Sequence, residues 1–224
     1  MSVFFLQKKW RLTIIYALSF IITLSSIVYA LLINNAQVYK HEQVFYFLVS
    51  KNQRLEASSF EIKAENGAGY LLEKDGKQYI ALSVYFNESD GENALQSAIT
   101  RFDDLAVVSI ISGDLYFITP FQKRTADRTI GGLKSFLGGI RALESEIKRL
   151  EKGATQQSSK RILNDVSQTI AYLGEENELF KSASVITTST VQEIIEDVVY
   201  LKDLRYLLCA LCMEYTSICS KFSL

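Results

Sequence analysis

The sequence predicts an α+β protein with an apolar N-terminal helix, a small α/β domain in the middle and a helical region at the C-terminus. Three observations predict this organisation. An uncharged apolar run occupies residues 12–33, strand-type and helix-type patterns alternate over residues 44–111, and apolar residues recur every three or four positions after residue 129. The predicted boundaries place the α/β domain at 44–120 and the helical domain at 121–224.

The apolar run predicts a membrane anchor. It contains 22 residues, enough for a helix to cross about 30 Å of hydrocarbon. Lys8, Lys9 and Arg11 precede it, and only Lys40 and His41 follow it closely. The positive-inside rule then predicts a cytoplasmic N-terminus at 1–11, a single transmembrane helix at 12–34, a juxtamembrane linker at 35–43 and a body outside the cytoplasmic membrane.

Two other interpretations of this run stay open. A signal peptide would be cleaved after Val28-Tyr29-Ala30, although the bulky Tyr29 and the continuing apolar residues 31–33 argue against cleavage. A buried helix of a soluble domain is the second alternative. The run is apolar on every face, whereas a helix at the surface of a soluble domain carries one apolar stripe.

The middle of the chain predicts a β-α-β-β-α-β arrangement with helices on one face of an antiparallel sheet. Apolar, β-branched and aromatic runs predict the strands, and the Asp75-Gly76 pair predicts a tight hairpin turn. The predicted strands are 44–50, 70–73, 77–86 and 105–111, and the predicted helices are 54–65 and 92–102. A further short strand at 115–119 ends before Pro120, the only proline.

The C-terminal region predicts three amphipathic helices, at 129–152, 158–173 and about 190–219. They would form a bundle, or a hairpin that binds a partner or a second copy of the chain. Gly131, Gly132, Gly138 and Gly139 are unusual inside such a helix. They indicate either the close approach of another backbone or a bent first helix.

Composition excludes several kinds of function. The net charge is −1, and residues 35–120 hold 7 basic and 12 acidic residues, a net charge of −5, which disfavours nucleic acid as a partner. The sequence contains no phosphate loop, dinucleotide fingerprint or metalloprotease motif. The single histidine, His41, is expected to be solvated. The sequence therefore predicts a non-enzymatic protein without cofactor or metal.

The three cysteines lie near the C-terminus, inside a helical pattern. Cys209 and Cys212 form a C-x-x-C, but such redox or metal motifs normally lie at a helix start or on a knuckle. We expect them to be small buried apolar side chains. The alternative is a disulfide between two chains through Cys212 or Cys219, which are one heptad apart.

The segment Tyr79–Phe86, followed by Asn87-Glu-Ser-Asp-Gly-Glu-Asn-Ala94-Leu95, resembles the SPOR family of peptidoglycan-binding repeats. The β-α-β-β-α-β order and a preceding single anchor are also typical of that family. The resemblance covers residues 44–111. It implies a ferredoxin-like module that binds glycan strands of the bacterial cell wall at sites of division or sporulation.

Strand alternation predicts which residues would carry this binding. Ile80, Leu82, Val84 and Phe86 would face the helices, which leaves an open sheet face for sugar rings. The candidate glycan-binding residues on that face are Tyr46, Ser50, Tyr79, Ser83 and Tyr85.

Three hypotheses for function follow. The first is a single-pass protein of the bacterial envelope that binds cell-wall glycan and assembles through its helices. The alternative is a structural or scaffold subunit of a membrane complex without glycan binding. A third, an accessory domain of a secreted enzyme, would require cleavage near Ala30.

Overall fold

The computed structural model describes residues 2–34, 36–51, 62–63, 65–99, 104–118, 123–196 and 198–223. Its helices are α1 (Ser2–Asn34), α3 (Glu88–Ala98), α4 (Lys123–Glu151), α5 (Ser159–Glu176), α6 (Lys181–Glu196) and α7 (Leu201–Ser220). Its strands are β1 (Ala36–Tyr39), β2 (Val44–Ser50), β3 (Tyr70–Lys74), β4 (Lys77–Tyr85), β5 (Leu105–Ile111) and β6 (Leu115–Ile118). Short 3-10 helices, η1 (Gln156–Ser158) and η2 (Glu178–Phe180), precede α5 and α6. The chain is α+β.

Four strands form an antiparallel sheet in the order β3-β4-β2-β5. The hairpin between β3 and β4 turns at Asp75 and Gly76, whose φ angles of 52° and 71° are those that a type I′ turn requires. The central strand β2 separates this hairpin from β5, as in a split β-α-β unit. The predicted first helix, 54–65, lies almost entirely outside the described residues.

A β-bulge changes which side chains of β4 share a face. Leu48 pairs with Ser83 and Val49 pairs with Ala81, so Leu82 is an extra residue in β4. Paired residues point to the same side of the sheet, and Leu82 and Ser83 therefore both face the side of α3. The alternation predicted through the whole strand is wrong beyond this point.

Helices cover both faces of the sheet. On one face, Leu48, Ile80 and Leu82 pack against apolar side chains of α3, among them Leu95. On the opposite face, Phe45 of β2 contacts Tyr215 of α7, with ring centroids 5.7 Å apart. The prediction that helices cover one face only is therefore wrong, because α7 packs on the face opposite α3.

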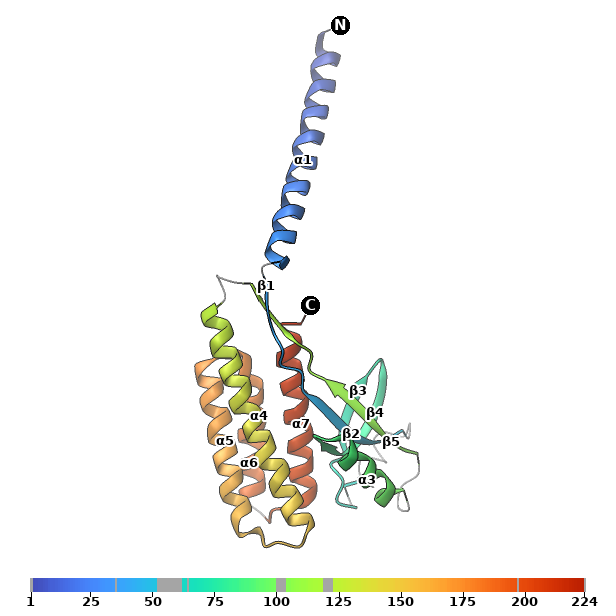
Figure 1. The fold of residues 1–224 in the computed structure, drawn as a ribbon, viewed down its shortest axis with the longest axis vertical. Coiled ribbons are helices and arrows are strands. Elements are labelled where there is room, and N and C mark those ends of the chain that lie inside the picture. Colours follow the sequence, from blue (N-terminus) through green and yellow to red (C-terminus); the bar gives the residue numbers. More distant parts are fainter. Residues whose placement is uncertain are drawn as a thin grey trace.

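Helices α4 to α7 form an antiparallel bundle in which each helix packs on the next and α7 also packs on α4 (Figure 1). α7 lies between the other helices and the sheet, where it also contacts β4 and β3. Ten of its side chains are buried, including all three cysteines. The bundle and the sheet thus share one hydrophobic core.

The predicted third helix, 190–219, is divided in the structure into α6 and α7. Between them Tyr200 is extended, with φ −92° and ψ 142°. Val199 is 1% exposed, and its carbonyl oxygen accepts a hydrogen bond from Gln156 Nε2 at 2.8 Å. The apolar period continues through this break because Val198 and Leu201 hold helical spacing, so the pattern predicted a single helix.

Residues 35–43, predicted as a linker, contain strand β1. β1 pairs with β6 over four residues, from Ala36 opposite Ile118 to Tyr39 opposite Leu115. The Tyr116 N–H donates to the Phe222 carbonyl oxygen at 2.9 Å. Strand β1 is therefore joined, through β6, to the residues that follow α7 by backbone hydrogen bonds.

Helix α1 extends away from the rest of the molecule (Figure 1). Within the described part of the chain, no helix combines the length and the apolar character that crossing a membrane requires. The predicted transmembrane helix at 12–34 is therefore wrong as an element of the fold.

Candidate functional site

The five predicted glycan-binding residues do not share one open surface. Tyr46 pairs with Tyr85 on the side of α3, and there Ser50 and Ser83 are 5% and 3% exposed. Tyr79 lies on the opposite side of the sheet and packs against the core shared with the bundle. The common open face predicted from strand alternation is therefore absent, and the role of these residues in glycan binding stays a prediction.

The absence of a side chain at Gly91 lets α3 lie close to the sheet. A Cβ atom placed there would be 3.5 Å from Tyr46 Cβ and 3.7 Å from Tyr85 Cδ2. Gly91 itself is buried. The two tyrosine rings are thus partly covered by α3, and burial raises the pKa of the Tyr85 hydroxyl.

Ser83 and Tyr85 line a hollow of about 300 Å³ beside Arg205 of α7, which we call the Arg205 hollow. Arg205 Nη2 is 2.7 Å from Glu151 Oε1, and Nη1 donates to the Asn66 carbonyl oxygen at 2.6 Å. Arg205 Nε is buried and has no hydrogen-bond partner among the described residues. The guanidinium group joins α7 to the end of α4 and to residue 66.

A larger cavity of about 550 Å³, here called the Tyr200 cleft, lies where the bundle meets residues 63–68. Its walls come from the end of α6, the start of α7 and the segment that precedes β3. Cavities of this size at the boundary of two structural units are typical ligand sites.

Two lysine–tyrosine pairs define the polar wall of the Tyr200 cleft. Lys63 Nζ lies 5.2 Å from the centroid of the Tyr206 ring, and Lys202 Nζ lies 5.1 Å from that of the Tyr200 ring. These are cation–π distances. The rings of Tyr70 and Tyr206 pack edge to face, with their centroids 5.4 Å apart. Burial raises the pKa of the Tyr70 hydroxyl to about 12. Tyr70 is therefore neutral at physiological pH.

Sequence reasoning missed the Tyr200 cleft. Its residues lie at positions 63–68 and 190–206, so no short motif joins them. Tyr200 was placed within a continuous helix, whereas the extended backbone at the α6–α7 connection is what brings its ring to the cleft. A break in the helix near residue 198 would have pointed to this region, but the sequence pattern predicted no break there.

The cysteines are buried in the core. Cys209, Cys212 and Cys219 are free thiols with no exposed surface. Burial raises the pKa of all three thiols, that of Cys219 to about 11. A disulfide to a second chain, the predicted alternative for Cys212 and Cys219, does not fit this placement because α7 is covered by the sheet and by the other helices.

His41 is not the solvated side chain that was predicted. Its Nε2 atom lies 2.5 Å from the Tyr215 hydroxyl, and its backbone N–H donates to Asp114 Oδ1 at 3.3 Å. Ser112 Oγ donates to the His41 carbonyl oxygen at 3.4 Å. Burial lowers the pKa of the imidazole, and the nearby charge of Lys134 lowers it further. His41 thus connects the segment after β1 to α7.

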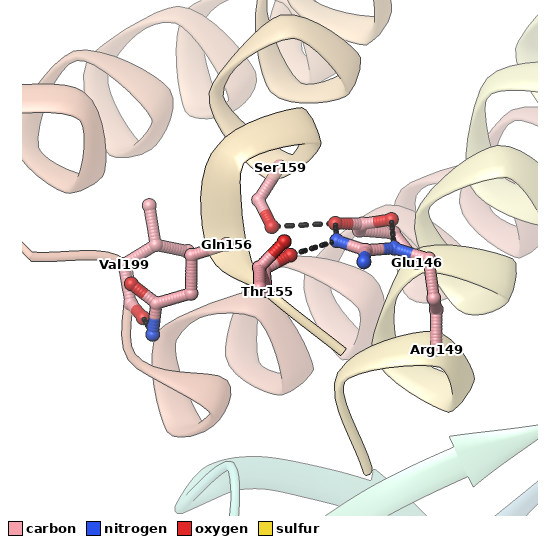
Figure 2. A network of polar contacts seen from close by, with 6 residues as sticks. All are labelled: Glu146, Arg149, Thr155, Gln156, Ser159 and Val199. Atoms are coloured by element: carbon pink, nitrogen blue, oxygen red, sulfur yellow. Dashed lines mark hydrogen bonds and ion pairs between the residues drawn. The ribbon is translucent and has the colours of Figure 1, made fainter. Parts of the chain in front are cut away.

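A polar network holds one end of the bundle together (Figure 2). Glu146, 2% exposed, accepts hydrogen bonds from Arg149 at 2.7 and 2.6 Å and from Ser159 Oγ at 2.5 Å. Arg149 also donates to the Thr155 carbonyl oxygen at 2.6 Å. The Arg149 bonds lower the pKa of the Glu146 carboxyl. Arg149 has a partner in the α4–α5 connection and Glu146 has one at the start of α5, so this network is structural.

No group of three or more histidine, cysteine, aspartate or glutamate side chains in the described residues is arranged to hold a metal ion. No protein-family model, curated protein or solved structure matches the chain. The resemblance to the SPOR family therefore stays a prediction. The exposed surface of α1 and the Tyr200 cleft are the two features of the structure that a binding function would use.

Proposed function

We propose that this protein is a non-enzymatic scaffold that attaches its folded body to a lipid membrane through α1. The observation that carries this proposal is the apolar surface of α1. Eleven large apolar side chains of this helix are 48–71% exposed. Such a surface is far more apolar than a helix in contact with water normally presents, and it needs a covering phase.

The distribution of these side chains favours lipid over a protein groove. Phe20, Ile21 and Ile22 are consecutive, so they point in three directions around the helix, and all are more than half exposed. A groove on another protein covers one face of a helix, whereas acyl chains surround it. Lys8, Lys9 and Arg11 precede this surface, and each basic residue near an anionic bilayer contributes about 1 kcal/mol to binding.

The body supports a scaffold role better than glycan binding. Both faces of its sheet are covered, so the aromatic face on which the glycan hypothesis depended is not free. The segment after α1 is joined to the rest of the body by the pairing of β1 with β6 and by the contact of His41 with Tyr215. The segment that follows the attachment helix is thus part of the folded body.

Co-flotation with vesicles tests this proposal. The full chain, purified in detergent, is mixed with phosphatidylcholine vesicles with or without phosphatidylglycerol, and the detergent is removed before centrifugation. We expect the full chain to float with the vesicles, more completely with the anionic lipid. The variant Phe20→Asn/Leu24→Asn/Ile27→Asn, which changes three exposed residues of α1, should stay at the bottom.

The matched control is Tyr172→Asn/Val185→Asn, which changes two large apolar side chains of the bundle that are 61% and 64% exposed. It should float like the unaltered chain. Flotation of the α1 variant to the same extent as the control would reject α1 as the attachment site. A full chain that stays at the bottom with both lipid compositions would reject membrane attachment itself.

A further inference from the structure

The Tyr200 cleft has the composition of a site for a ligand that carries both charges. Two basic residues, Lys63 and Lys202, and two acidic residues, Glu193 and Asp203, line the cleft, so its positive and negative charges are equal in number. A site for an anion or a cation alone would show an excess of the opposite sign. The balance favours a ligand that is itself zwitterionic.

The ammonium groups of Lys63 and Lys202 are positioned to bind an anionic group. Each lies over a tyrosine ring, at 5.2 Å for Lys63 and 5.1 Å for Lys202. A ring under the ammonium group restricts a flexible side chain but leaves its outward N–H bonds available. Lysines fixed in this way lose less conformational entropy when a carboxylate binds, and this favours binding.

Glu193 supplies the opposite charge from α6. Its exposed carboxylate forms no ion pair or side-chain hydrogen bond among the described residues, unlike Glu146 and Glu151. A free carboxylate beside a cavity is a partner for an ammonium group of a ligand. Lys63 precedes β3, Glu193 belongs to α6 and Lys202 to the start of α7, so three separate segments supply these charges.

Apolar residues also line the cleft. Ala68 and Ile194 are 0% and 5% exposed, and Val198 adds an exposed apolar side chain at the rim. A cavity of about 550 Å³ that is lined by charges of both signs and by apolar side chains is large enough for a ligand of several residues. We propose that the Tyr200 cleft binds a short zwitterionic peptide, with its carboxylate at Lys63 and Lys202 and its ammonium group at Glu193.

Three probes separate the two charges of such a ligand. The full chain in detergent micelles is titrated with trialanine, with N-acetyl-trialanine, which keeps only the carboxylate, and with trialanine amide, which keeps only the ammonium group. Saturation-transfer NMR reports binding. We expect trialanine to bind at least about five-fold more tightly than either blocked peptide, because each blocked peptide loses one charge-assisted contact.

Variants of the lining residues test which residue binds each charged group of the peptide. Lys202→Gln should weaken trialanine and N-acetyl-trialanine but leave trialanine amide unchanged. Glu193→Gln should weaken trialanine and trialanine amide but leave N-acetyl-trialanine unchanged. The matched controls Lys77→Gln and Glu175→Gln, at exposed positions outside the cleft, should alter nothing.

The proposal fails if no probe shows saturable binding. It also fails if the three probes bind with equal affinity. It fails as well if the Lys202→Gln and Glu193→Gln variants bind trialanine as tightly as the control variants do. All four variants lie at the surface or the rim, and equal unfolding temperatures would show that a loss of binding is not a loss of fold. The outcome is independent of vesicle attachment, which requires α1 alone.

Discussion

Gly132 of α4 lies directly against the ring of Phe180. A Cβ atom at Gly132 would be 2.7 Å from two ring carbons of Phe180, whereas one at Gly131 would meet nothing within 4 Å. Overpacking costs about 1–3 kcal/mol, and alanine gains about 1 kcal/mol over glycine in a helix. We expect Gly132→Ala to lower the free energy of unfolding by about 1 kcal/mol and Gly131→Ala to raise it by up to about 1 kcal/mol, measured by urea denaturation.

The pair of neighbouring glycines makes this test internally controlled. Both substitutions add the same methyl group to the same helix, so helix propensity affects both equally. If both variants gained stability, the ring of Phe180 would not lie where the structure places it. The sequence left two interpretations of these glycines open, the close approach of another backbone or a bent helix. The structure places a ring from η2, not another backbone, against Gly132.

His41 makes the stability of the body depend on pH. The folded state lowers the pKa of this imidazole, chiefly by burial, so the unfolded chain binds the proton more readily. The corresponding stability is fully present above the unfolded pKa of about 6.5 and is lost as the pH falls below it toward the folded pKa. We expect the unfolding temperature of the unaltered chain to fall over this interval. The unfolding temperature of the His41→Gln variant should fall less.

Because His41 is the only histidine, the difference between the two chains isolates its contribution from that of the carboxyl groups. The measurement is a series of thermal melts between pH 7.5 and pH 5. Parallel curves for the unaltered chain and His41→Gln would show that the imidazole is not buried against Tyr215.

Single side chains are where sequence reasoning failed most clearly. The alternation that placed Tyr79, Ser83 and Tyr85 on one face ignored the bulge at Leu82, which moves every later residue of β4 to the other side. The ligand-binding candidates Tyr200 and Tyr206 carry no motif. Both errors concern positions that depend on pairing partners distant in the sequence.

At the scale of elements, the network around Glu146 holds α4, the α4–α5 connection and α5 together. Removing the charge of a buried, hydrogen-bonded carboxylate leaves its donors unsatisfied. We expect Glu146→Gln to lower the free energy of unfolding by about 1–3 kcal/mol in urea denaturation.

Glu178 provides the control for this substitution. It also pairs with a basic residue three positions later, Lys181, but the two side chains are 83% and 65% exposed. Exposed pairs contribute less than about 1 kcal/mol, so Glu178→Gln should change stability little. Equal losses in the two variants would show that burial does not strengthen the Glu146 network.

The elements themselves were largely predictable, and the exceptions have physical causes. The Asp75-Gly76 turn and the periods of α4 and α5 are local features, and local patterns predicted them well. The break between α6 and α7 depends on a hydrogen bond from Gln156, more than forty residues away along the chain. Strand β1 depends on its pairing with β6, which no local pattern reveals.

At the scale of the whole molecule, the sheet and the bundle share one core. The Tyr215 ring lies 5.7 Å from that of Phe45 in the sheet and 5.9 Å from that of Phe136 in α4. We expect the body to unfold in one transition, with coincident loss of helical circular dichroism and of amide protection in β2 and β4. Separate transitions would instead favour two independent domains with a boundary near residue 120.

The attachment of this body through α1 is the central claim, and Trp10 offers its most direct test. Trp10 is the only tryptophan of the chain and belongs to α1, so its fluorescence reports on this helix alone. The measurement is quenching of that fluorescence by brominated acyl chains in vesicles. We predict a blue-shifted emission that the brominated lipid quenches. Emission typical of water, unaffected by brominated lipid, would contradict the claim.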